Sequence, residues 1–151
     1  MKTFFDLRIK SLLLALLAAT ALLACFSTPG ALDTRFYYSD GEALRFMESL
    51  LPLEVFNYYR GEAIDLLVYI PIYVSLFWFS LRKLYPTRLY HWLALIPLVT
   101  DVYETVNILL FLALEKPLLP LMGVATMIKW TSALALSALI FYTLFKRYKK
   151  V

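Results

Sequence analysis

Two carboxylates and an amide lie inside one of the most apolar parts of the chain. Asp101, Glu104 and Asn107 follow one another at steps of three within the stretch LVTDVYETVNILL. At about 100° per residue, these side chains occupy an arc of about 120° on one helix. A charge at the centre of a membrane-spanning helix costs roughly 2.5–3.5 kcal/mol on insertion scales. The spacing therefore predicts a polar face directed at other helices rather than at lipid.

One lysine lies at the matching depth of the next apolar segment. Lys129 shares a helical face with Thr126 and Ser132. Because a buried charge is tolerated mainly when it meets an opposite one, we expect Lys129 to pair with Asp101 and Glu104. Two carboxylates against one lysine leave surplus negative charge, which a protonated carboxyl group or a visiting cation would balance.

Other polar and aromatic residues could line a cavity beside this cluster. Asp65 lies about one turn inside the outer end of another apolar segment, from which it could meet Asn107. Pro71 and Pro97 should bend their helices and open space between them. The candidate ligand-binding residues are Asp101, Glu104, Lys129, Asp65, Asn107, Tyr69, Tyr73, Tyr103 and Trp130.

The elements that must position these residues are membrane-spanning helices. The chain of 151 residues is 62% hydrophobic, with a mean hydropathy of +0.71. Four apolar segments are long enough to cross about 30 Å of hydrocarbon at about 1.5 Å per residue. We predict spans at 11–27, 63–81, 89–114 and 119–145, with an outer loop at 28–62. The expected fold is all-α, an integral membrane four-helix bundle that forms a single domain, 1–151.

Basic residues alternate between the connections, which predicts the orientation. Ten lie on the side of the two termini and four on the other side, the pattern expected when the richer side is cytoplasmic. We therefore predict a multi-pass membrane protein with both termini in the cytoplasm, which in a bacterial cell corresponds to the inner membrane, and no nucleic-acid partner. The ten are Lys2, Arg8, Lys10, Arg82, Lys83, Arg88, Lys146, Arg147, Lys149 and Lys150; the four are Arg35, Arg45, Arg60 and Lys116.

A short amphipathic helix is predicted in the outer loop. Ser39 and Glu42 have the spacing of a capping box, and apolar residues follow at helical intervals up to Leu51. Pro52 should end or kink this helix. Such a helix would lie on the membrane interface, cap the bundle, or merely connect two spans.

The chain has one cysteine and one histidine, which excludes internal disulfides and several kinds of metal site. Cys25 is the single cysteine, so an internal disulfide and a multi-thiolate metal site are excluded. LLAC around Cys25 also has the form of a lipidation site after a signal peptide, although a leucine- and alanine-rich span produces this string by chance. His91 is the single histidine, placed among interfacial aromatics. We expect no metal and no cofactor.

Several motifs resemble those of a group of uncharacterised bacterial four-span membrane proteins. The similar stretches are YSDGEALRFMESLLPLEVFNYYRGEAIDLLVYIPIY, PLVTDVYE and IKW. The matching positions are Tyr38, Asp65, Pro71, Tyr73, Asp101, Glu104 and Lys129. Thr105 stands where the group usually has asparagine. A fainter likeness, at Asp65 and Pro71, is to the fold of sterol isomerases and the sigma-2-type receptor (EXPERA), which implies a lipid-like ligand in an intramembrane pocket.

Three functions remain open at this stage. The first is binding of a small amphiphile, lipid or cationic ligand in a carboxylate–lysine core. The second is a non-enzymatic accessory or assembly subunit of a larger membrane complex, with purely structural charges. The third is an isomerase-type membrane enzyme that uses a carboxyl group as general acid. An apolar-lined pocket that reaches Asp101 would favour the first or the third, and a filled interior the second.

Overall fold

The chain folds into helices joined by short connections. The structure is a computed structural model that describes residues 2–26, 30–85, 87–114 and 120–148. The predicted limits at Ser27, Thr28 and Leu119, and the basic residues Lys116, Lys149 and Lys150, lie outside the described residues. In order, the elements are α1 (Lys2–Ala24), the 3-10 turn η1 (Leu32–Thr34), α2 (Asp40–Glu48), α3 (Pro52–Ile64), the π-turn η2 (Asp65–Tyr69), α4 (Ile70–Leu84), α5 (Arg88–Trp92), α6 (Leu95–Leu114) and α7 (Met122–Tyr148). The described ranges contain no strand, so the all-α prediction is confirmed.

Three helices are long and apolar enough to cross a membrane. They are Pro52–Leu84, Arg88–Leu114 and Met122–Lys146. They contain or largely overlap the predicted spans 63–81, 89–114 and 119–145. The predicted first span, 11–27, overlaps a shorter apolar stretch within α1, Ile9–Ala24.

The longest helix is continuous through α3, η2 and α4, with one wide turn in its middle. Within η2 the Ile70 amide donates to the Asp65 carbonyl, five residues back. Pro71 lies just beyond; it has no N–H, and its ring would collide with the Leu67 carbonyl in a regular helix. The π-turn accommodates the proline at this point. Pro52 does not simply end the preceding helix: it begins α3, where its missing N–H removes no hydrogen bond.

The predicted third span is interrupted near its start. α5 ends at Trp92 and α6 begins at Leu95, with a turn at 93–94. The break falls at the carbonyl four residues before Pro97, which is where a proline ring collides with a helix backbone. The helix is therefore irregular at the position where the ring of Pro97 requires it.

The capping box predicted for the outer helix is confirmed. The Ser39 hydroxyl accepts from the Glu42 amide at 3.3 Å, and Glu42 Oε2 accepts from the Ser39 amide at 2.7 Å. These hydrogen bonds from Ser39 hold the pKa of Glu42 below its usual range. α2 turns Ala43 and Met47 inward, and covers the ends of α6 and α7 next to it.

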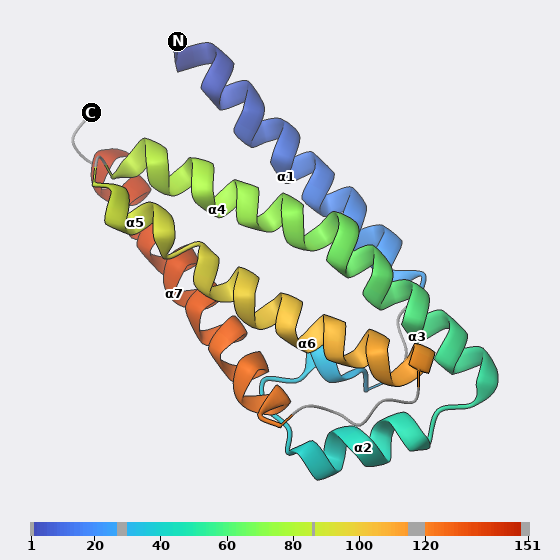
Figure 1. Ribbon diagram of the computed structural model, residues 1–151. Helices are drawn as coiled ribbons and strands as arrows, with labels where there is room; N and C mark the ends of the chain where they lie inside the picture. Colours follow the sequence, from blue (N-terminus) through green and yellow to red (C-terminus); the bar gives the residue numbers. More distant parts are fainter. Residues whose placement is uncertain (1, 27–29, 86, 115–119, 149–151) are drawn as a thin grey trace.

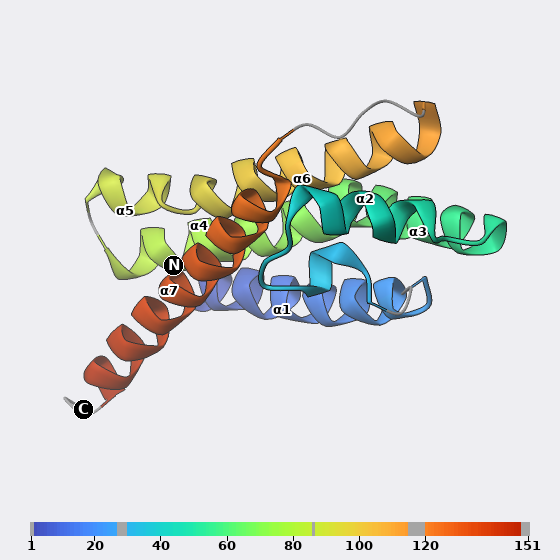
Figure 2. The same cartoon turned by 90° about the horizontal axis from the view of Figure 1, so that it is seen from below.

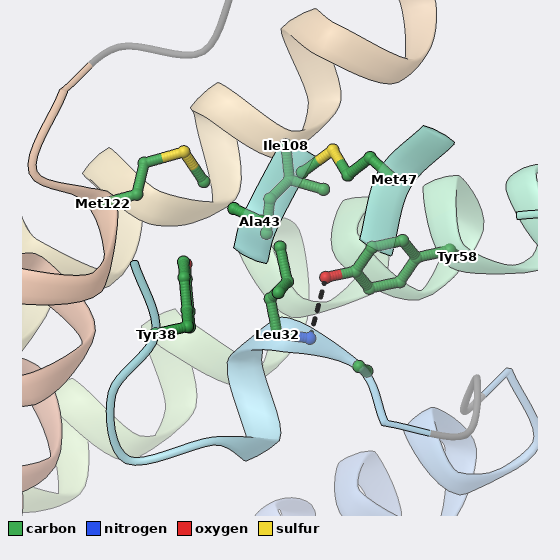
Figure 3. Close-up of a cluster of buried hydrophobic side chains, with 8 residues drawn as sticks. Leu32, Tyr38, Ala43, Met47, Tyr58, Ile108 and Met122 are labelled. Carbon is green, nitrogen blue, oxygen red and sulfur yellow. Dashed lines mark hydrogen bonds between the residues drawn. The ribbon is translucent and has the colours of Figure 1, made fainter. Parts of the chain in front are cut away.

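The helices pack with two apolar clusters between them. α4, α6 and α7 contact one another, and α1 lies along α4 and η2 (Figures 1 and 2). The start of α1, α5 and the end of α7 lie at one end of the molecule, and α2 lies at the other (Figure 1). Near α2, Leu32, Met47 and Ile108 belong to a core that joins the outer loop to α6 and α7 (Figure 3). Near α5, a smaller core holds Leu81 and Leu136.

Candidate intramembrane site

Lys129 of α7 lies between two carboxylates of α6. Its Nζ is 3.0 Å from Asp101 Oδ1 and 2.6 Å from Glu104 Oε2. The side chain of Glu104 is fully buried, and those of Asp101 and Lys129 are only 6% and 10% exposed. The ion cluster predicted from the sequence is therefore confirmed. Because Asp101 and Glu104 are three residues apart on α6, one ammonium group on the facing helix can reach both carboxylates.

Glu104 is the more completely satisfied of the two carboxylates. Its Oε1 accepts from the Tyr38 hydroxyl at 2.6 Å and lies 2.6 Å from the Thr126 hydroxyl, while Oε2 accepts from Lys129. The Thr126 hydroxyl also lies 3.0 Å from the Met122 carbonyl of its own helix. With donors on both oxygens and no exposed surface, Glu104 has its hydrogen-bonding capacity filled by the protein.

Tyr38 reaches this cluster from the outer loop rather than from a span. Its side chain is buried, and it points inward from the segment before α2 (Figure 3). Burial and the neighbouring Glu104 raise the pKa of Tyr38 far above its usual range, so the phenol keeps its proton and donates. The approach is possible because Gly123 presents no side chain to the Tyr38 backbone.

Asp101 is oriented by a tyrosine of α4. The Tyr73 hydroxyl donates to Asp101 Oδ2 at 2.7 Å and lies 3.3 Å from the Pro97 carbonyl. Tyr69 packs against Tyr73 with ring centres 5.6 Å apart. Tyr69 is the last residue of the wide turn η2, and Tyr73 follows in the first turn of α4. Asp101 thus connects the ion cluster to α4.

Three other predicted residues make contacts away from Lys129. Asp65 Oδ2 accepts from the Thr105 hydroxyl of α6 at 3.3 Å. Thr105 is the residue that replaces the asparagine usual in the resembling group. Asn107 donates to the Tyr103 carbonyl of its own helix at 2.8 Å. The Tyr103 hydroxyl donates to the Pro120 carbonyl at 2.7 Å, and its ring packs on the core beneath α2.

A cleft of about 570 Å³ opens beside the ion cluster. Leu16, Thr20 and Leu23 of α1 form one wall, and Trp130, Ala133 and Ser137 of α7 form the opposite wall. Residues of α3, η2 and α4 also line it, as do Ala31 and Thr34 from the segment before α2. The lining is mostly apolar, but Asp101 and Lys129 lie at its inner surface. An apolar-lined cleft that reaches Asp101 is the feature expected of a ligand site.

The cleft separates the predicted site residues into two sets. Asp65, Tyr69, Tyr73, Asp101, Lys129 and Trp130 line it. Glu104, Asn107 and Tyr103 are not among its lining residues; Glu104 lies behind Lys129 and supports it from the side away from the cleft. The sequence therefore located the polar core, whereas the division into lining and supporting residues depends on the packing.

Sequence reasoning missed Glu62 and Gly123, and it assigned no contact to Thr126 or Tyr38. Glu62 is a buried carboxyl group of α3 that lines the cleft, and Thr126 bonds Glu104. Tyr38 was singled out only by resemblance, and Gly123 not at all. The capping box that follows Tyr38 indicated a helix start, but not that the Tyr38 side chain is buried. The sequence signal for that burial was Gly123 and Thr126, a small and a polar residue at the start of α7, in the stretch GVAT.

The two remaining candidates lie apart from the cluster. Cys25 is exposed, with its Sγ 3.4 Å from the Ala21 carbonyl. His91 packs against Trp78, and its Nε2 lies 3.2 Å from the Tyr85 carbonyl near α5. Within the described ranges, no group of three or more histidine, cysteine, aspartate or glutamate side chains is arranged to hold a metal ion.

Comparisons with known proteins yield no relative. No family model, curated protein or solved structure matches the chain.

Proposed function

We propose that this chain is a four-span protein of a bacterial inner membrane whose cleft binds a small amphiphile with a cationic head. The cleft beside Asp101 is the observation that carries the proposal. Its volume of about 570 Å³ falls within the range of roughly 300–1,000 Å³ typical of small-molecule sites. Its apolar walls suit a hydrocarbon chain, and its polar inner surface suits a head group.

The charges around the cleft favour a cationic head. Three carboxyl groups line it, those of Glu62, Asp65 and Asp101, and Glu104 lies directly behind. Lys129 is the one basic residue among the described lining residues, and it already contacts two of these four acids. An additional positive charge would lower the electrostatic cost of this acidic surface in a medium of low dielectric constant. Because the acids do not converge as metal ligands do, an organic ammonium fits better than a metal ion.

The proposed orientation rests on charge and on the position of the helix ends. The basic residues gather in the first part of α1, around the α4–α5 connection and from Lys146 near the end of α7 onward. The start of α1 and the end of α7 lie at the same end of the molecule (Figure 1). α1 would be the fourth span. Reporter domains inserted at Thr34 and fused to the C-terminus should report opposite sides of the membrane, and a cytoplasmic signal at Thr34 would overturn this topology.

A chain-matched series of ligands tests the binding. Purified protein is offered dodecylamine, dodecanol or dodecanoate, and the bound molecules are counted by native mass spectrometry. We expect dodecylamine to be retained most strongly. Asp101→Asn should weaken its binding at least about tenfold, equivalent to about 1.4 kcal/mol, while the exposed control Glu48→Gln should leave it unchanged. Equal retention of the amine and the alcohol, or unaltered binding by Asp101→Asn, would contradict the proposal.

The second candidate is a structural role for the same charges in an accessory or assembly subunit. Each carboxylate oxygen of Asp101 and Glu104 already lies within hydrogen-bond distance of a protein donor. Such a saturated cluster can fix helix register without a ligand. In that case none of the three compounds binds selectively, and substitutions at Asp101 alter stability alone.

A further inference from the structure

A second cavity follows the cleft toward the opposite end of the molecule. It has a volume of about 280 Å³ and lies between the same three helices, α1, α4 and α7. On α4 the first cavity reaches Phe77 and the second begins at Ser80; on α7 the corresponding residues are Ser137 and Ile140. Three residues of helix correspond to about 5 Å. The two cavities therefore follow one another along α4 and α7.

The chemistry of this second cavity is opposite to that of the first. Lys10 of α1 and Lys83 of α4 both line it, and its described lining includes no acidic residue. The first cavity instead carries three carboxyl groups. Two ammonium groups that come from different helices to one cavity provide the charge that a phosphate diester requires. Ser80, on the same wall, contributes a hydroxyl that can donate.

The rest of the lining is apolar and fits a hydrocarbon chain. Ile9, Leu84, Ile140 and Leu144 complete the cavity. Inorganic phosphate would gain nothing from contact with these apolar side chains, whereas a phospholipid can place its acyl chains beside them. Basic pockets between spanning helices at the cytoplasmic side are a recurrent form of anionic-lipid site.

We propose that this cavity binds one anionic phospholipid, with its phosphate against Lys10 and Lys83 and an acyl chain along Leu84, Ile140 and Leu144. The end of α4, α5 and the end of α7 lie at this end of the molecule (Figure 1), and they contain Arg82, Arg88 and Lys146. That end lies in the head-group layer of the cytoplasmic leaflet. The bound lipid fills this cavity between α1, α4 and α7, and so holds α1 against the other two helices. This site is separate from the amphiphile site and does not depend on Asp101.

Lipid selectivity in a matched pair of variants tests the proposal. Full-length protein in a neutral detergent is offered phosphatidylglycerol and phosphatidylcholine with identical acyl chains, and adducts are counted by native mass spectrometry. We expect phosphatidylglycerol to be preferred at least tenfold. Lys10→Gln with Lys83→Gln should abolish the preference. Arg82→Gln with Lys146→Gln removes the same charge from exposed positions outside the cavity lining, and should preserve it.

Two further measurements separate a lipid site from a general attraction of anions. Leu144→Trp places bulk in the cavity and should reduce retention of both lipids at unchanged charge. Millimolar inorganic phosphate should not displace phosphatidylglycerol, because it cannot occupy the apolar walls. Equal loss of selectivity in the two double variants would overturn the proposal. So would displacement by phosphate, or selectivity that survives Lys10→Gln with Lys83→Gln.

Discussion

Gly123 lies so close to Tyr38 that a Cβ at position 123 would be 1.6 Å from the Tyr38 carbonyl oxygen. The neighbouring atoms are backbone, which cannot move aside as the end of a flexible side chain can. This contact brings the outer loop against the start of α7. It also allows the Tyr38 hydroxyl to reach Glu104 at 2.6 Å. One glycine at the start of α7 thus decides whether a loop residue can complete the buried ion cluster.

Gly123→Ala should therefore displace the loop and destabilise the protein. Overpacking in a filled interior typically costs 1–3 kcal/mol, and the loss of the Tyr38 hydrogen bond adds to it, so we expect about 3 kcal/mol. Gly61→Ala is the matched control, because its Cβ would meet Phe26 at an ordinary 3.6 Å and alanine favours a helix. Thermal unfolding in detergent should rank the variants, and equal melting temperatures would show that the Tyr38 contact does not form.

The two carboxylates of the cluster should respond differently to neutralisation. Asp101→Asn leaves Lys129 paired with Glu104 at 2.6 Å. Its amide oxygen can accept from Lys129 while its NH2 donates to the Tyr73 hydroxyl, which can still donate to the Pro97 carbonyl. We expect a change in unfolding free energy within about 1 kcal/mol. Glu104→Gln alters the group that pairs with Lys129 and accepts from Tyr38 and Thr126, so the cost should approach the roughly 3–5 kcal/mol of a broken buried pair. Equal effects would show that the two carboxylates are interchangeable.

Lys129→Ala should sharply reduce the amount of folded protein that can be extracted from the membrane. It leaves two buried carboxylates without their counter-charge, at a cost of roughly 3–5 kcal/mol. A variant that combines Lys129→Met with Asp101→Asn and Glu104→Gln should recover much of the loss, because no charge is then left unpaired. Size-exclusion yield and melting temperature report both effects. Normal stability of Lys129→Ala would contradict the cluster.

Stability should fall at alkaline pH through Tyr38. Its pKa is raised in the folded state, whereas an unfolded tyrosine titrates near 10. The unfolded chain therefore loses this proton first. The contribution of Tyr38 is complete below about pH 10 and decreases as the pH rises above that value. Tyr38→Phe should flatten the decline between about pH 10 and 11, and the exposed Tyr37→Phe should not. Urea or thermal unfolding across this pH range measures the difference.

The polar core could be predicted from the sequence because its energetics leave few alternatives. Charges in apolar helices must meet, and counting residues from the helix ends placed Asp101, Glu104 and Lys129 at one depth. The capping box of Ser39 and Glu42 likewise depends only on local spacing. These features follow from short-range rules, and the structure confirms them.

The remaining parts of the site depend on long-range packing. Asp65, which accepts a hydrogen bond from Thr105, is the first residue of the π-turn η2. This wide turn changes the helical register that a regular helical wheel assumes. Pro52 has the same sequence signature whether it ends one helix or begins another, and here it begins α3. The burial of Tyr38 requires a glycine 85 positions later, a pairing that no local pattern indicates.

Fluorescence of Trp130 gives the most direct measurement of the proposed amphiphile site. Trp130 lines the cleft beside Lys129, whereas Trp78 and Trp92 pack together near α5 and can be replaced by phenylalanine. A long-chain amine with bromine atoms on its chain should quench Trp130 at concentrations at least about tenfold lower than the brominated alcohol of equal length. Asp101→Asn should remove that advantage. Equal quenching by amine and alcohol, with no effect of Asp101→Asn, would contradict a cation-binding cleft.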